Sequence, residues 1–378
     1  MKAREKIEAA FSPAGSSETG VVLCYEGIYY RDHWDQLTTC PWWYALSGDI
    51  EHQLAWRREC ITATPQDWFR LPMAATRLER EAVTIEERSD GVYRVDARTG
   101  DIERLQRPLK SGWDAAGRMS PPPPVKPAGT PQEVDREVPL RKEFDAQEFA
   151  ESGRADLAAR MREEFSDLYP LVHATSPLWC TNRLWGFEDM MTTTALNPEL
   201  VAYAGERYLA NGIQQVREAA ALGGRAVWIE ECLTDYISPK AFAELNIPLL
   251  RALIEEIHRC GMKSIYYYCG NPADRWDELF EVGADVLALE EAKKGWQVDI
   301  EDVVARAAGR TAVLGNLDAL VLLEQGPASA IKREIQRQID AGRANDGRFV
   351  MSIGSPVTPD TPVEHVRLYC DMTHELGS

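Results

Sequence analysis

The sequence lacks the usual signatures of nucleotide binding, disulfide frameworks and membrane insertion. No GxGxxG and no GxxxxGK[ST] pattern occurs, so neither a Rossmann loop nor a P-loop is indicated. The eight cysteines are scattered without a CxxC pair, which indicates thiols in a reducing compartment. No stretch approaches the roughly 18 consecutive apolar residues of a membrane span, and the first residues contain no apolar signal-peptide core. We therefore expect a cytoplasmic protein with no membrane partner.

Basic residues are scarce relative to acidic ones. The chain has 42 Lys and Arg against 60 Asp and Glu, a formal net charge of −18, and no block rich in Lys or Arg. This charge repels nucleic acids and anionic membranes, so we expect neither as a partner. Histidine is also scarce, with six residues, and few groups other than carboxyls can therefore move a proton near neutral pH.

Short apolar runs rich in β-branched residues recur from the middle of the chain onward, each followed by a helical pattern. This alternation is typical of βα units on a parallel sheet. We expect strands at 21–25, 171–174, 226–230, 264–269, 286–290, 312–317 and 349–353. The 378 residues can hold eight such units, and an open doubly wound sheet would usually show a Gly-rich loop. We predict an α/β fold, a single (β/α)8 TIM barrel over 1–378.

Helix signals are clearest in the C-terminal half. Ser238-Pro239 suits a capped helix start and Gly261 a helix stop, which predicts one helix between them. Thr361-Pro362 repeats the start signal before a last helix.

One segment in the N-terminal half interrupts the βα rhythm. Residues 90–103 form two alternating runs around Thr99-Gly100, the pattern of a β-hairpin. A proline-rich stretch at 120–132 follows and favours an extended linker. We predict that 85–150 is an insertion covering one end of the barrel, with a separate small domain as the alternative.

Five motifs lie at the ends of predicted strands. They read IEECLTDYISPKAF at 229–242, YYYCGNP at 266–272, GADVLALEEAKKG at 283–295, GNLDA at 315–319 and GSPVTPDTPVEHV at 354–366. As a set they resemble the uroporphyrinogen decarboxylase superfamily, in register from about residue 223 to the end and more loosely through YRDHWDQLTTCPWW at 30–43. The resemblance implies a (β/α)8 barrel with its pocket at the carboxyl ends of the strands, where barrel enzymes gather their chemistry.

Two departures from the family pattern favour one branch. The resemblance implies that the decarboxylase holds a porphyrinogen with an arginine-rich N-terminal segment, and no such segment occurs here. The other branch contains corrinoid-dependent methyltransferases, some of which bind zinc through HxCG, a later glutamate and a late cysteine. Here the HxCG positions 267–270 read Tyr-Tyr-Cys-Gly, and the late cysteine position holds Ser355. The resemblance favours the methyltransferase branch, with the zinc-site cysteine kept at Cys269 and the glutamate at Glu290 or Glu291, but without the histidine and the late cysteine.

A different metal site remains an open alternative. Cys269 and Glu290, with Glu230 or Glu231, would form a three-ligand site richer in carboxylates than zinc usually prefers.

We predict Glu230, Glu290 and Tyr267 as catalytic residues. Side chains alternate along a strand, so Glu230 shares its face with Trp228 and Cys232, while the opposite apolar face should meet the outer helices. Two desolvated carboxyls near Cys269 would have different pKa values. The carboxyl with the raised pKa would keep its proton, as a general acid requires. The alternatives are solvated ion pairs for the carboxyls and aromatic packing for the tyrosine.

A second set of residues is predicted to bind substrate. It comprises Glu231, Asn316, Asp318, His173 and Trp179. Asn316 and Asp318 lie two residues apart and can face one pocket, although both suit ordinary turns. A lone histidine is usually structural and most tryptophans pack in cores. An aromatic lining would suit a flat, weakly charged substrate.

These residues lead to a predicted activity. We expect a methyltransferase that moves a methyl group from a small methylated substrate, such as an aryl methyl ether, to Co(I) of a corrinoid on a partner protein. The ether oxygen is a poor leaving group and must be protonated or coordinated as the methyl departs. A decarboxylase or lyase acting on a small carboxylated substrate, and a non-catalytic barrel that binds small aromatics, are the alternatives. The methyl donor and the oligomeric state, including a homodimer, stay open.

Overall fold

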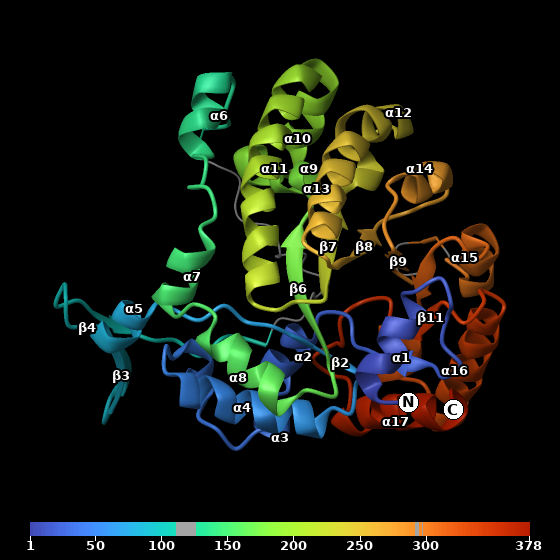
Figure 1. Ribbon diagram of the computed structural model, residues 1–378, viewed down its shortest axis with the longest axis horizontal. Helices are drawn as coiled ribbons and strands as arrows, with labels where there is room; N and C mark the ends of the chain where they lie inside the picture. Colours follow the sequence, from blue (N-terminus) through green and yellow to red (C-terminus); the bar gives the residue numbers. More distant parts are fainter. Residues whose placement is uncertain (111–125, 292–294, 297) are drawn as a thin grey trace.

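Eight parallel strands form the centre of the molecule (Figure 1). The computed structural model describes residues 1–110, 126–291, 295–296 and 298–378. The barrel strands are β1 (Gly20–Val21), β2 (Trp68–Arg70), β6 (Tyr169–Thr175), β7 (Ala226–Cys232), β8 (Lys263–Cys269), β9 (Val286–Leu289), β10 (Ala312–Leu314) and β11 (Phe349–Met351). They pair in the order β1-β11-β10-β9-β8-β7-β6-β2. The predicted α/β barrel is confirmed.

The two end strands of this sheet, β1 and β2, meet through the residue before β2. The backbone N–H of Asp67 donates to the Val21 carbonyl at 2.8 Å, and the Asp67 carboxylate accepts from the Val21 N–H at 2.8 Å. The sheet is therefore a nearly closed barrel.

Helices surround the barrel and connect its strands (Figure 1). They are α1 (Ala3–Ala10), α2 (Glu26–Asp32), α3 (Trp34–Leu37), η1 (Trp42–Leu46), α4 (Ile50–Ala63), α5 (Arg77–Ala82), α6 (Pro131–Glu137), α7 (Ala146–Ser152), α8 (Asp156–Glu164), α9 (Pro177–Cys180), α10 (Asn182–Leu196), α11 (Pro198–Ala221), η2 (Thr234–Tyr236), α12 (Pro239–Ala241), η3 (Phe242–Asn246), α13 (Ile247–Arg259), α14 (Trp276–Glu281), α15 (Ile300–Ala307), η4 (Ala319–Glu324), α16 (Ala328–Arg343) and α17 (Val363–Leu376). The last agrees with the predicted C-terminal helix.

The core lies between the barrel and its helices. Parallel strands are covered on both faces, so their sequences are continuous apolar runs. Strands β9, β10 and β11 are buried along their whole length. In β7 the burial extends from Ala226 through Ile229, and the polar residues begin only at Glu230. Strand β7 thus ends in polar side chains where the barrel opens.

Three elements differ from the sequence prediction. Strand β2 was missed, because its sequence Trp-Phe-Arg has only two apolar residues and no β-branched one. Strand β1 ends at Val21 instead of reaching Tyr25, which adopts a left-handed conformation (φ 52°) that begins α2. The single helix predicted after Ser238 is interrupted by η3, a π-helical turn before Pro248, whose missing N–H interrupts regular α-helical bonding.

The inserted segment contains a small antiparallel sheet. Strands β3 (Val83–Arg88), β4 (Gly91–Asp96) and β5 (Ile102–Arg104) pair in chain order and project from one edge of the molecule (Figure 1). The hairpin around Thr99-Gly100 is therefore present, with β3 as an additional strand. Of the predicted linker, 120–125 lies outside the described residues, and α6 begins at Pro131 where extended chain was expected. The role of 85–150 as a cover stays a prediction.

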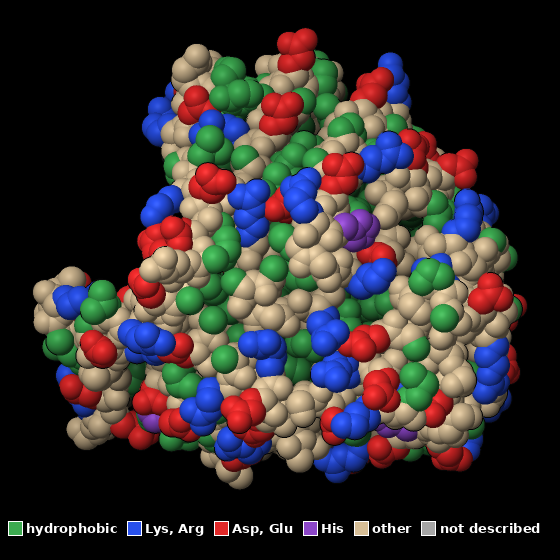
Figure 2. Space-filling model, viewed as in Figure 1, with side chains coloured by type: hydrophobic (Ala, Val, Ile, Leu, Met, Phe, Trp, Pro, Cys, Tyr) green, Lys and Arg blue, Asp and Glu red, His purple; other side chains and the backbone are tan. Residues whose placement is uncertain are grey.

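Charged side chains of both signs are interspersed on the face seen in Figure 2, with several Lys and Arg grouped near its centre. Within the described ranges, no helix combines the length and apolar composition that crossing a membrane requires.

Candidate active site

Strands β7 and β8 bring the predicted polar residues together. The two strands run parallel in register, so Glu230 pairs with Tyr267 and Cys232 with Cys269. Glu230, Cys232 and Cys269 are each half-buried at strand ends, whereas Trp228 and Tyr267 below them are buried. Alternation along the strands therefore turns a carboxyl and two thiols toward the mouth of the barrel.

Glu230 carries a carboxyl group with a perturbed proton affinity. Burial raises its pKa above the ordinary value, while hydrogen bonds from Tyr25 and Cys232 and the positive charge of Arg183 act in the opposite direction. The Cys232 Sγ lies 3.6 Å from the Glu230 Oε1. A carboxyl whose pKa is raised keeps its proton to a higher pH, which is the state that a general acid needs.

An aromatic wall extends below Glu230. Trp228 stacks on Tyr267 with ring centroids 4.9 Å apart and on His173 at 5.8 Å. Tyr25 meets all three rings edge-on, each at 5.6 Å between centroids. The Tyr267 hydroxyl donates to the Gly354 carbonyl at 2.9 Å. Aromatic rings packed against one another therefore occupy the barrel interior below Glu230.

His173 belongs to this wall as a neutral ring. Burial, together with the positive charge of Arg70, lowers its pKa to about 3. It is therefore uncharged near neutral pH, and its stacking on Trp228 is a contact between two neutral rings.

Cys232 and Cys269 form a thiol pair. A hydrogen bond to Cys269 is the main cause that raises the pKa of Cys232 well above its ordinary value, and burial adds to it. Negative charge on Glu230 and Glu290 acts in the same direction. All eight cysteines of the chain carry thiols. The Cys232 thiol is consequently protonated near neutral pH.

Glu290 and Glu291 follow β9 and are both buried. The charge of Glu290 raises the pKa of Cys232 and of Tyr267, so it lies within the same cluster. Glu291 instead accepts a hydrogen bond from the Ser355 hydroxyl at 2.8 Å, which links the ends of β9 and β11. The lysines predicted to screen this pair, at 293–294, lie outside the described residues.

The structure separates other predicted residues from this cluster. Glu231 lies on the opposite face of β7, where its carboxylate accepts from the Asn246 amide at 2.7 Å. The Asn316 amide donates to the Val298 carbonyl at 2.7 Å, and Asp318 caps η4. These contacts are of the kind that packing and turns require, and substrate binding by these residues stays a prediction. Trp179 is half-buried on α9.

Sequence reasoning missed Tyr25 and assigned no role to Cys232. Cys232 could have been found from its alternation with Glu230 and from its counterpart at the end of the next strand. Tyr25 has no such signal, because its position depends on a left-handed turn after β1.

The residues at the mouth were also tested against a metal site. Two thiols and carboxyls are suitable donors in kind. However, no three or more His, Cys, Asp or Glu side chains within the described part of the chain are arranged to hold a metal ion. The site at Cys269 and Glu290 stays a prediction, and no chemical step below passes through a metal.

Comparison with known proteins places the fold in a family. Residues 119–376 match the family "Uroporphyrinogen decarboxylase (URO-D)". Uroporphyrinogen decarboxylase of Anaeromyxobacter sp. (strain Fw109-5) is 28% identical over 193 residues, which are 51% of this chain and 53% of that protein. The corresponding protein of Pelobacter propionicus is 25% identical over 180 residues, 48% of this chain and 50% of that protein. The chain thus spans about half the length of these curated relatives.

A solved structure described as a methyltransferase from Methanosarcina mazei has the same fold over its whole length. It superimposes with a TM-score of 0.64 and 16% sequence identity, covering 100% of both chains. The family match covers well over half of the chain and agrees with the motifs at the strand ends, so this chain belongs to the uroporphyrinogen decarboxylase family.

Proposed function

We propose that this chain is an enzyme that removes a methyl group from a small, weakly charged substrate and passes it to a corrinoid carried by a partner protein. An aryl methyl ether is the substrate class that the site suits best. The observation that carries the proposal is the carboxyl of Glu230, with a raised pKa, above an interior wall of neutral aromatic rings. The methyltransferase fold of the Methanosarcina mazei protein is compatible with it.

Glu230 would serve as the general acid. As the methyl carbon leaves the ether oxygen, the electron pair of the broken C–O bond stays on oxygen, and the Glu230 proton moves to that oxygen. The products on the enzyme are a phenol or alcohol and a Glu230 carboxylate, which takes a new proton from solvent. Proton transfer of this kind typically contributes about 10²- to 10⁴-fold to the rate.

The corrinoid supplies Co(I), the nucleophile that accepts the methyl group. This chain would supply the binding surface for the other reactant. A flat ring can lie against the half-buried rings of His173 and Tyr25, and neutral rings impose no charge requirement on it. The partner-held group would approach the carboxyl ends of the strands, where barrel enzymes keep their sites open.

Tyr25 and Cys232 would position the acid. Both form hydrogen bonds with the Glu230 carboxyl, Tyr25 from the start of α2 and Cys232 from the last residue of β7. Restricting the carboxyl to one orientation keeps its proton aimed at the leaving oxygen.

A second function has one observation in its favour. The positive charges of Arg70 and Arg183 act on His173 and Glu230, respectively, so cations lie near both ends of the aromatic wall. Two guanidinium groups could hold one carboxylate. The competing proposal is therefore decarboxylation of a small acid without a corrinoid.

The deciding experiment is a methyl-transfer assay with reduced cobalamin and a panel of methoxylated aromatics. We expect Glu230→Gln to lower kcat/KM by about 10²- to 10⁴-fold. The control is Glu255→Gln, an exposed glutamate on α13, which should keep full activity. In the unmodified enzyme, kcat/KM should fall by about tenfold per pH unit above the raised pKa, and the residual rate of Glu230→Gln should not follow pH.

Two results would reject the proposal. One is a Glu230→Gln enzyme with unchanged kcat/KM toward its best methyl donor. The other is turnover of a small carboxylic acid with release of CO₂ in the absence of any corrinoid, which would establish the competing function.

A further inference from the structure

Two aromatic side chains are exposed at the mouth of the barrel and contact each other. Phe187 is 37% exposed and Tyr236 is 59% exposed, and their rings meet edge-on with centroids 5.1 Å apart. Among the described residues they are the only exposed aromatic side chains. Phe187 lies on α10, which comes after β6, and Tyr236 ends η2, which comes after β7. The pair therefore lies at the same end of the barrel as Glu230.

Two left-handed residues set the course of the backbone that carries these rings. Gly186, directly before Phe187, has a φ of 69° and interrupts α10, a conformation that glycine adopts without steric cost. Leu233 has a φ of 60° and turns the chain from β7 into η2. A leucine in this region is uncommon, so its surroundings must hold the turn in place.

A buried arginine holds the loop that carries Tyr236. Arg275 is 1% exposed, and its guanidinium donates to the carbonyls of Thr234 at 2.6 Å and of Ile237 at 3.0 Å. These two carbonyls flank Tyr236 in the chain. Hydrogen bonds from a charged donor are stronger than neutral ones, so the loop is fixed before any ligand arrives. An exposed ring on a fixed loop loses little conformational freedom when it binds a partner.

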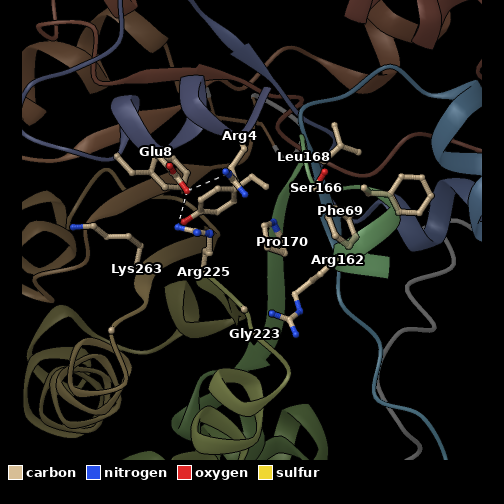
Figure 3. A pocket seen from close by; sticks show the side chains of 15 residues that line it. Arg4, Glu8, Phe69, Arg162, Ser166, Leu168, Pro170, Gly223, Arg225 and Lys263 are labelled. Atoms are coloured by element: carbon tan, nitrogen blue, oxygen red, sulfur yellow. Dashed lines mark ion pairs between the residues drawn. The ribbon is translucent and has the colours of Figure 1, made fainter. Parts of the chain in front are cut away.

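The opposite end of the barrel presents a different surface. The recess in Figure 3 lies where β6, β7 and β8 begin, and charged side chains that include Glu8, Arg225 and Lys263 line it. Arg225 pairs with Glu8 at 2.7 Å. The rings of Phe69 and Tyr169 in this recess are 0% and 1% exposed. The exposed aromatic pair thus belongs to the end of the barrel at which the proposed reaction occurs.

Acidic side chains lie beside the aromatic pair. Glu188 and Asp189 follow Phe187 and are exposed, and Asp274 is exposed in the loop that also supplies the buried guanidinium. Arg183, four residues before Phe187, is a cation in the same stretch. Carboxylates repel a macrocycle that carries several carboxylates, and they accept hydrogen bonds from amide groups.

We propose that Phe187 and Tyr236 contact the corrin ring when the partner protein brings it to the mouth of the barrel. A corrin is a flat macrocycle whose periphery carries methyl groups and amide side chains. The methyl groups suit the exposed aromatic rings, and the amides suit the neighbouring carboxylates. This contact rests on the proposed methyl transfer, because that reaction requires a corrinoid at this end of the barrel.

The test is calorimetric titration with methylcobalamin, which needs no methyl donor. We expect Phe187→Ser and Tyr236→Ser each to weaken binding about tenfold, as the loss of an aromatic anchor does. Tyr236→Phe keeps the ring and should bind nearly as the unmodified chain does. Leu196→Ser removes a leucine that is 80% exposed at the last residue of α10, and it should leave binding unchanged.

Steady-state kinetics with reduced cobalamin give a second readout. The two serine variants should raise KM for cobalamin about tenfold, because they remove a contact made equally in the ground state and the transition state. Both kcat and KM for the methyl donor should stay nearly unchanged.

Three outcomes would overturn the contact, and they point to different causes. Unchanged cobalamin affinity in both serine variants, with methyl transfer intact, would reject the contact and leave the proposed function standing. A change from dimer to monomer in either variant, seen by size-exclusion chromatography, would assign the pair to self-association instead. Neither cobalamin binding nor methyl transfer in the unmodified chain would reject the proposed function and the contact with it.

Discussion

Glu230 and Glu231 are adjacent in the sequence and lie in different surroundings. Glu230 faces the barrel interior beside Tyr25 and Cys232, and Glu231 faces the helices, where it accepts from Asn246. Burial raises the pKa of both carboxyls. Only Glu230, however, lies at the mouth of the barrel, where it could donate its proton to a substrate.

The buried Glu231 predicts a pH-dependent stability. Burial raises its pKa to about 7, above the ordinary value of 4.5, so the folded state holds the proton more tightly than the unfolded state. The stabilisation of the folded state by protonated Glu231 is complete below pH 4.5 and is lost as the pH rises through about 7. We expect Glu231→Gln to raise the free energy of unfolding at pH 8 by up to about 3 kcal/mol, and to change it little at pH 4.5.

Urea denaturation at both pH values would measure this effect. Glu255→Gln, on the exposed side of α13, should leave the free energy of unfolding nearly unchanged from that of the unmodified chain at both pH values. Some pH dependence should remain in Glu231→Gln, because burial also raises the pKa of Glu26 to about 7. An equal change at pH 4.5 and pH 8 would contradict the assignment of the titration to Glu231.

Two neighbouring strands determine the chemistry of the thiol pair. Cys232 and Cys269 are register partners on parallel strands, and such strands lie about 4.8 Å apart. That spacing is within the range that a disulfide requires. The strands therefore hold two thiols where oxidation could join them beside the proposed acid.

We predict that mild oxidation crosslinks Cys232 to Cys269 and lowers activity, because the crosslink would remove the thiol that hydrogen-bonds to Glu230. Mass spectrometry of tryptic peptides should detect the crosslink, and dithiothreitol should restore activity. Cys269→Ser should resist inactivation, whereas Cys40→Ser, at a half-buried thiol outside the barrel, should not. Equal sensitivity of these two variants would refute the prediction.

At the scale of the whole molecule, the small sheet β3–β5 is an addition to the barrel. Its own apolar cluster consists of Trp43, Val92 and Leu105, and it contributes no strand to the main sheet. The barrel core continues without it through residues from every barrel strand. The two units should therefore be separable.

We expect that replacing 84–103 with a flexible Gly-Ser linker of about six residues leaves a folded barrel. Helical circular dichroism should persist, and the melting temperature should fall by only a few degrees, because only the smaller cluster is lost. Loss of cooperative unfolding in the shortened chain would mean that the sheet supports the barrel. An unchanged corrinoid-dependent rate would further indicate that the sheet takes no part in partner docking.

Short apolar runs were enough to predict β6 to β11, because a strand buried on both faces must be apolar along its length. The barrel itself was predicted from the chain length, the absence of a Gly-rich loop and the family resemblance. Alternation along β7 likewise separated Glu230 from Glu231 before any contact was known. Strand β2 was missed because its three residues form no apolar, β-branched run.

The neighbours of each side chain required tertiary structure. The hydrogen bond from Tyr25 to Glu230 joins residues about two hundred positions apart, and it forms only because the barrel brings the start of α2 beside the end of β7. Side-chain period is a property of a few consecutive residues, whereas register between strands and the closure of a ring depend on packing over the entire chain.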